Sequence, residues 1–217
     1  MSSTYKSLAA QKERNYLFFA SFAMCVAVVA SNILVQYPVG LFDLDALLTY
    51  GAFTYPFSFL INDLTNRFYG PDAARRVVYV GFISAAFISW ILATPRLAIA
   101  SSTVFLFGQL LDIIVFTPLR RKTWWKAPLI AALVGSALDT ILFFSLAFAS
   151  SFSFIDKLVD YSDSSIIDSV IVIGIKIPVW FSLAFGDFSI KIIMSLFMLV
   201  PYGIILRSFR TPFYQGR

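Results

Sequence analysis

The stretch LAIASSTVFLFGQLLDIIVFTP, residues 97–118, decides the fold of this chain. It carries a single charged residue, Asp112, and is long enough for a helix to cross the hydrocarbon core of a bilayer. The whole chain has the same character, because 59% of its residues are hydrophobic and its mean hydropathy is +0.81. A soluble domain could not cover so much apolar surface with polar groups. We therefore predict an integral membrane protein.

Apolar stretches of similar length recur along the 217 residues. We predict an all-α polytopic protein with one domain over residues 1–217 and six spans, at 16–36, 46–64, 77–92, 97–118, 128–150 and 181–206. That arrangement leaves no room for a separate soluble domain, so we do not expect an attached enzyme. No signal-peptide cleavage site follows the first apolar run, which should remain as the first helix. Pro56 should kink the second span, since proline cannot complete the hydrogen bonding of the preceding turn.

Basic residues lie in short clusters between the spans and indicate the orientation. With a cytoplasmic N-terminus, the outer segments hold only Arg96, Lys157 and Lys176. The inner segments then hold Lys6, Lys12, Arg14, Arg67, Arg75, Arg76, Arg120, Arg121, Lys122, Lys126, Arg207, Arg210 and Arg217. The positive-inside rule thus predicts that both termini are cytoplasmic. We attribute the pI of 9.4 to these clusters and expect no nucleic-acid partner.

The outer segment 151–180 is the least regular part of the chain. It is rich in Ser and Asp and then turns apolar in IIDSVIVIGIKIPVW, residues 166–180. The apolar part is too short to cross a bilayer. It is either an interfacial or re-entrant segment that acts as a lid over an outward-facing cavity, or an amphipathic helix on the membrane surface.

Asp112 and Asp139 interrupt two neighbouring spans. At 1.5 Å per helical residue, both lie at similar depth in antiparallel helices. GQLLDIIVF (108–116) and GSALDTILF (135–143) match at five of nine positions, and each has Gly four residues before Asp on one helix face. A charge at the bilayer centre costs about 2.5–3.5 kcal/mol on insertion scales. We interpret both aspartates as functional; the alternative is that they hydrogen-bond neighbouring helices as structural contacts.

Asp187 and Lys191 stand four residues apart in the sixth span, the separation at which opposite charges meet on a helix. Two interpretations stay open. The pair neutralises itself, or Lys191 reaches Asp112 or Asp139 and is released or captured as a substrate binds.

Three further polar residues are candidates for the same site. Asp63 lies closer to the cytoplasmic edge, one turn before Arg67, where a structural and a transport role are both open. Asn32 and Gln109 carry amides that suit a neutral heterocycle, although helix packing also uses such amides. The chain has no histidine, so carboxylates are the candidates for any proton relay and we expect no metal site.

Several motifs resemble a known family. SNILVQ (31–36), LTYGAFTYPFSFLINDLTNRFYGPDAARRVVYVGF (48–82) and GQLLDIIVF are similar to the bacterial queuosine precursor transporters, also called the vitamin uptake transporter family. DLTNRFYG followed by ARR is the most specific part, and Pro71 stands where some members have a basic residue. The resemblance covers essentially the whole chain. It implies a six-helix inner-membrane protein that imports 7-cyano-7-deazaguanine or its aminomethyl form for queuosine synthesis in tRNA.

The implied substrate suits the polar residues. A deazaguanine presents adjacent ring N–H and amino donors, which one carboxylate accepts with two oxygens. Asp112 or Asp139 would bind the base, with Gln109 or Asn32 on its carbonyl edge. The other aspartate would couple to a proton or pair with Lys191 in the empty state. We expect no cofactor. The alternative functions are a substrate-binding subunit of an ATP-driven uptake system and, with less support because no metal motif is present, a membrane enzyme.

Overall fold

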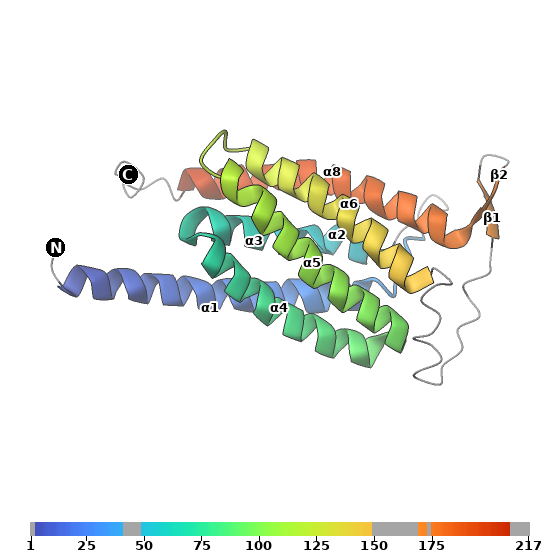
Figure 1. Cartoon of the computed structure of the whole chain (residues 1–217), viewed down its shortest axis with the longest axis horizontal. Helices are drawn as coiled ribbons and strands as arrows, with labels where there is room; N and C mark the ends of the chain where they lie inside the picture. The colour runs from blue at the N-terminus through green and yellow to red at the C-terminus, as the bar shows by residue number, and fades with distance from the viewer. Residues whose placement is uncertain (1–2, 41–48, 149–168, 173–174, 209–217) are drawn as a thin grey trace.

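The computed structural model describes residues 3–40, 49–148, 169–172 and 175–208, and helices account for most of them. The elements are α1 (Ser3–Leu34), α2 (Gly51–Thr54), α3 (Pro56–Tyr69), α4 (Pro71–Leu92), α5 (Pro95–Leu119), α6 (Lys126–Phe148), β1 (Ser169–Val172), β2 (Ile175–Pro178) and α8 (Val179–Ser208). The long helices run side by side along the long axis of the molecule (Figure 1). Within the described residues, α1, α4, α5, α6 and α8 are long and apolar enough to cross a membrane. The prediction of an all-α polytopic membrane protein is confirmed.

Proline and glycine set the starts of the helices. Pro56, Pro71 and Pro95 each stand in the first turn, where a missing amide hydrogen costs nothing and the proline φ suits a helix. Gly70 links α3 to α4 with a φ of 92°, a conformation that side-chain-bearing residues rarely adopt. Thr94 caps α5 by accepting a hydrogen bond from the Leu97 amide.

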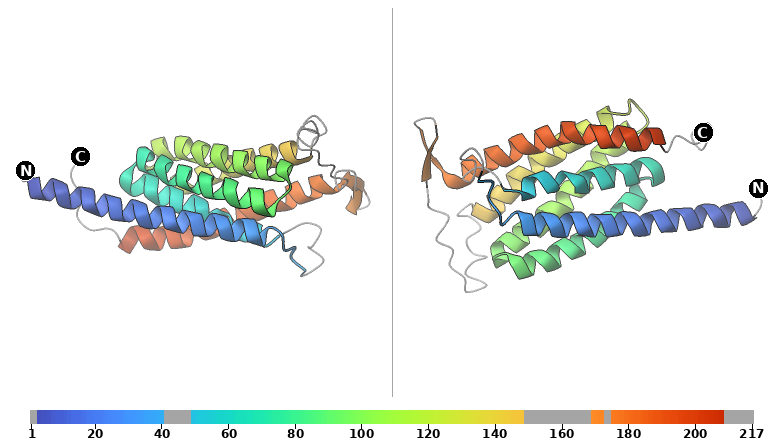
Figure 2. Two further views of the ribbon diagram at one scale, coloured as in Figure 1. Left: turned by 90° about the horizontal axis from the view of Figure 1, so that it is seen from below. Right: turned by 180° about the vertical axis from the view of Figure 1, so that it is seen from behind.

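The second predicted span is a broken helix. Its described part comprises the single turn α2 and the longer α3, and the break falls at Tyr55, immediately before Pro56. The Ser58 side chain donates to the Tyr55 carbonyl at 2.7 Å, so this carbonyl keeps a partner at the break. The kink expected at Pro56 is thus found as an interruption of the helix, and Figure 2 shows α2 and α3 lying between α1 and α8.

The bundle presents apolar side chains outward and encloses polar ones. Phe18, Phe87, Phe185 and Phe197 are each about two-thirds exposed or more. Buried polar side chains lie where helices meet, among them Ser58, Asn62, Asp63, Thr65, Asn66, Ser89, Arg96, Gln109, Asp112, Ser136, Asp139 and Lys191. Such a distribution is expected when the surrounding solvent is lipid, because unpaired polar groups are then driven into the protein interior.

Two boundaries differ from the predictions. The first helix starts at Ser3 and not at residue 16, because the polar residues before the apolar run continue the same helix. Residues 169–172 and 175–178 form an antiparallel pair of strands, so the alternative of an amphipathic surface helix is wrong for them, and the interfacial or re-entrant position stays a prediction. Their Val and Ile residues favour extended backbone. The rest of the predicted outer segment, residues 151–168, lies outside the described residues, and the role of the apolar part as a lid stays a prediction.

The start of α1 and the end of α8 lie at the same end of the bundle (Figure 1). The connections α3–α4 and α5–α6 lie at that end as well, and the α4–α5 connection lies at the opposite one. This arrangement is what an even number of crossings requires. The basic end of the bundle is therefore called the inner end below, in line with the positive-inside prediction, and the other the outer end.

Candidate functional site

A cavity of about 280 Å³ lies in the outer half of the bundle. It is lined by the last turns of α1, by α2, and by the outer halves of α5, α6 and α8. Phe105, Phe143, Phe144 and Phe148 contribute aromatic surface to its walls. A mostly apolar cavity with a few convergent polar groups is the usual form of a small-molecule site.

A charged cluster forms the deep end of this cavity. Lys191 on α8 forms ion pairs with Asp139 on α6 and with Asp187 one turn before it. The Tyr55 hydroxyl donates to Asp139 Oδ1 at 2.9 Å, and Thr140 donates to Asp187 Oδ2 at 2.9 Å. Two carboxylates face one ammonium group, so the cluster keeps an excess of acceptors for a ligand that brings hydrogen-bond donors.

A glycine of α5 lies beside this cluster. A methyl group on Gly108 would lie 3.5 Å from Asp139 Oδ1, in ordinary van der Waals contact with the carboxylate. Gly135 of α6 in turn approaches the Gly108 carbonyl and the Phe59 ring. The two glycines of the repeated motif therefore mark the α5–α6 crossing. Gly108 lies next to the aspartate of the opposite helix and not beside its own.

A second polar cluster lies between α3 and α5, toward the inner end. Asn62 donates to Asp112 Oδ2 at 3.0 Å and to the Gln109 carbonyl at 3.2 Å. The carboxyl groups of Asp63 and Asp112 lie within hydrogen-bonding reach of each other. Gln109 donates to the Ser58 hydroxyl at 2.8 Å. Asn62, Asp63, Gln109 and Asp112 are all at most 3% exposed, so this cluster is closed to bulk water.

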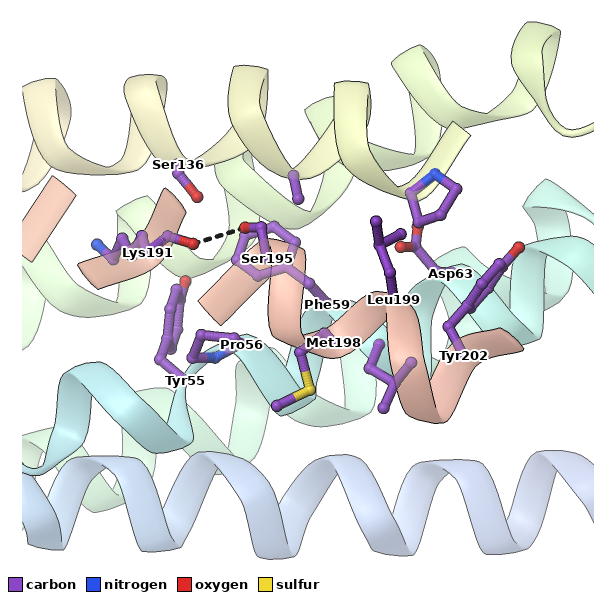
Figure 3. Close-up of a pocket in the computed structure, with 13 residues that line it drawn as sticks. Tyr55, Pro56, Phe59, Asp63, Ser136, Lys191, Ser195, Met198, Leu199 and Tyr202 are labelled. Carbon is purple, nitrogen blue, oxygen red and sulfur yellow. Dashed lines mark hydrogen bonds between the residues drawn. The ribbon is translucent and has the colours of Figure 1, made fainter. Parts of the chain in front are cut away.

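A narrow cavity of about 20 Å³ joins the two clusters. Tyr55 and Lys191 line one end of it, and Asp63 and Tyr202 line the other (Figure 3). Between them lie the hydroxyl groups of Ser136 and Ser195, and Ser195 donates to the Lys191 carbonyl at 2.6 Å. The volume matches about one water molecule, so this passage is closed to anything larger.

Arg67 closes the inner end of the passage. Its Nε donates to the Tyr202 hydroxyl at 2.8 Å, and its Nη2 donates to the Trp124 carbonyl at 3.2 Å. The guanidinium also lies over the Phe116 ring at 5.4 Å. Within the described residues no ion pair joins Arg67 to Asp63, so the guanidinium links α3 to α8 and to the α5–α6 connection instead.

The structure sorts the predicted site residues into two groups. Asn32, Asp139, Asp187 and Lys191 line the outer cavity. Gln109, Asp63 and Asp112 lie in the second cluster and do not line it. Lys191 pairs with its helical neighbour Asp187 and also reaches Asp139, whereas its release or capture by a substrate stays a prediction.

Sequence reasoning missed Tyr55, and it identified Asn62 only as one of several amides within the predicted spans. Tyr55 supplies a hydroxyl to Asp139, and Asn62 supplies an amide to Asp112. The position of Tyr55 directly before Pro56 was the available signal for the first, because helix breaks in membranes commonly line cavities. For Asn62, its place beside Asp63 in an apolar segment was the only signal.

Comparison with known proteins gives a consistent family relationship. Residues 49–94 and 84–205 match the family described as "Putative vitamin uptake transporter". The chain is 32% identical to the "Probable queuosine precursor transporter" of Haemophilus influenzae, over 90% of this chain and 88% of that protein. It is 31% identical to the "Queuosine precursor transporter" of Escherichia coli, over 88% of this chain and 86% of that protein. No solved structure matches.

Proposed function

Since this chain belongs to the vitamin uptake transporter family, we propose that it imports a queuosine precursor across the inner membrane as a secondary transporter. The substrate class comes from the names of the two relatives that match along most of the chain. We take the substrate to be a 7-deazaguanine base, either 7-cyano-7-deazaguanine or its aminomethyl form.

The outer cavity, with its aromatic walls and its acidic deep end, is the observation that carries this proposal. A deazaguanine is planar, and the faces of Phe105, Phe143 and Phe144 offer stacking surface. Its ring N–H and amino group are adjacent donors that match the two oxygens of a carboxylate. We assign Asp139 to this contact. Asn32 lines the same cavity and is the candidate for the carbonyl edge of the base.

Lys191 lines both the outer cavity and the narrow cavity, so it can link substrate binding to the opening of the narrow cavity. Lys191 pairs with Asp139, so a base that binds the carboxylate competes with the ammonium group. Tyr55 and Lys191 also line the narrow cavity, which places them at the boundary between the outer cavity and the inner end. In the proposed cycle, displacement of Lys191 loosens this boundary, and release of the Arg67–Tyr202 contact opens the inner end.

The proposal is tested in cells that cannot make the precursor and that lack this gene. Precursor is supplied outside at low concentration, and queuosine in tRNA is measured with and without the restored protein. We expect queuosine to depend on the protein. Equal queuosine in both strains, with the protein verified in the membrane, would contradict precursor import.

Asp139→Asn tests the assignment of the carboxylate in the same cells. Each hydrogen bond to a charged group is worth about 1.5–3 kcal/mol, so we expect the precursor concentration needed for half-maximal queuosine to rise at least about tenfold. Asp72→Asn is the matched control, because the Asp72 side chain is 85% exposed and pairs only with Arg75 on its own helix. An Asp139→Asn protein that matches this control at low precursor would refute the assignment.

A substrate-binding subunit of an ATP-driven system is distinguished by reconstitution. Import by the purified chain alone in liposomes, without ATP, supports a secondary transporter. Import that requires a second protein and ATP would refute the assignment as a secondary transporter.

A further inference from the structure

We propose that Asp63 and Asp112 form a proton-binding site that couples precursor import to the proton gradient. This inference rests on the proposed function and adds the coupling ion. It assigns separate tasks to the two clusters: the outer cavity holds the base, and the α3–α5 cluster holds the proton.

The first support is the contact between the two carboxyl groups. Asp63 is 3% exposed and Asp112 is 1% exposed, and their carboxyl groups lie within hydrogen-bonding reach of each other. An ionised carboxylate only accepts hydrogen bonds, so a bond between two carboxyl groups requires a proton on one of them. Two like charges in such a site cannot both be ionised without strong repulsion. The described arrangement is therefore the proton-loaded one.

The second support is an excess of acceptors around the pair. Asn62 Oδ1, Gln109 Oε1, Asp63 Oδ1 and Asp112 Oδ1 are buried, and among the described residues none receives a hydrogen bond. Asn62 and Gln109 are 0% exposed, so bulk water does not satisfy their oxygens. An enclosed site with more acceptors than donors favours the uptake of a proton, which brings a donor and needs no space of its own.

Within the part of the chain that the structure describes, the cations near the pair make their direct hydrogen bonds and ion pairs with other groups, and Arg67 acts on Asp63 only through its charge. Arg67 on α3 is held by Tyr202 and Trp124, and Arg120 on α5 donates to the Asn66 carbonyl. On α8, Lys191 lines the narrow cavity opposite Asp63 but pairs with Asp139 and Asp187.

The remaining helices around α3 bring little charge to the pair. On α1, Tyr16 bonds Thr65. Helix α6 lines the narrow cavity with Pro128, Ala132 and Ser136. The buried residues of α4 are Ala73, Ala74, Val77, Val78, Gly81, Ala85 and Ser89. None of these α4 and α6 residues is titratable. A proton is therefore the positive charge that this pair can take up.

A continuous set of contacts links the pair to the substrate cavity. Asn62 bonds both Asp112 and the Gln109 carbonyl, and the Gln109 amide bonds Ser58. Ser58 in turn donates to the Tyr55 carbonyl, and the Tyr55 hydroxyl holds Asp139. Loss of the proton would leave two buried charges in contact and push α3 away from α5. That movement would shift Tyr55, the boundary of the outer cavity.

The experiment uses the purified full chain in liposomes that contain a pH-sensitive dye. Labelled 7-cyano-7-deazaguanine is the probe. We expect external precursor to bring protons in, and an acidic exterior to raise precursor accumulation several-fold over equal pH. Precursor exchange at equal pH, without a gradient, is measured in the same preparation. Exchange without any effect of the pH gradient, or accumulation driven by a sodium gradient alone, would overturn the coupling but not import. Absence of exchange in the wild type would overturn both.

Asp63→Asn and Asp112→Asn test the site itself. Each variant should lose the precursor-dependent proton signal and the pH-driven accumulation, while exchange at equal pH remains measurable because exchange moves no net proton. Asp72→Asn, on the exposed first turn of α4, should keep all three signals. Proton entry that persists in both variants would overturn the assignment. The wild-type proton signal decides the coupling even if a variant fails to fold.

Discussion

At the scale of single residues, Lys191 is the most constrained side chain of the outer site. It is 6% exposed and sits between Asp139 and Asp187, in a part of the bundle that carries apolar side chains outward. A buried ion pair adds little net stability, but removal of one partner leaves an uncompensated charge. The structural interpretation of Lys191 therefore does not exclude the proposed functional one, since one ammonium group contacts both carboxylates.

Lys191→Met should lower the free energy of unfolding by about 3–5 kcal/mol, because Asp139 and Asp187 would then be buried together without a cation. The double variant with Asp139→Asn should recover part of that loss, since only one carboxylate remains. Thermal unfolding of the purified protein in detergent measures both effects. Lys122→Met, at an exposed position, is the control and should unfold like the wild type. Full additivity of the Lys191 and Asp139 changes would contradict the pairing.

At the scale of elements, the broken helix determines where the outer cavity ends. The single turn α2 packs closely on the end of α1, and Tyr55 follows it at the break. A methyl group on Gly51 would lie 2.9 Å from the Cα, Cβ and amide nitrogen of Val35. The close approach of these two backbones therefore depends on the missing side chain.

Gly51→Ala should cost about 1–3 kcal/mol of stability, because the α1 backbone cannot yield as a flexible side chain would. It should also lower precursor import, since α2 would move against the cavity that it lines. Gly40→Ala is the matched control, as a methyl group there meets nothing within 4 Å. Thermal unfolding and the queuosine assay measure the two effects. If Gly51→Ala and Gly40→Ala have the same stability and the same import, the α1–α2 contact accommodates the added methyl group and the prediction is wrong.

At the scale of the whole molecule, the bundle combines an apolar exterior with polar clusters at two depths. One cluster lines the outer cavity, and the other lies between α3 and α5, with a passage of about 20 Å³ between them. Arg67 and Tyr202 close the inner end. The architecture thus holds a ligand-sized space on one side of a narrow barrier, the arrangement of one state in an alternating cycle.

The orientation follows from the distribution of basic residues and is open to direct measurement. In a Cys25→Ser background, Leu92→Cys at the end of α4 should react with a membrane-impermeant maleimide added outside. Lys122→Cys, in the exposed α5–α6 connection, should react only when the inner face is accessible, as in inverted vesicles. The reverse pattern would contradict the positive-inside prediction and exchange the outer and inner ends of the passage.

Much of the fold was predictable because the bilayer acts on local properties of the chain. The length and hydropathy of each segment predict a crossing, and the described long helices match the predicted spans apart from their ends. The α1 extension escaped prediction because it is polar and lies outside the apolar runs. The β1–β2 pair escaped because its apolar run is too short to cross a bilayer, so hydropathy alone does not determine its conformation. Intramembrane carboxylates were visible for the same reason, since each stands out against its apolar neighbours.

The sequence by itself determined which segments cross the membrane and which residues are costly to place there. Only the tertiary structure decided how those residues are paired. Asp112 and Asp139 have similar surroundings in the sequence, yet Asp112 meets Asn62 and Asp63 on α3, whereas Asp139 meets Tyr55 and Lys191. Depth follows from position along a helix, but the partner depends on how each helix is rotated against its neighbours. That rotation is set by packing between segments 50 or more residues apart, and no local pattern encodes it.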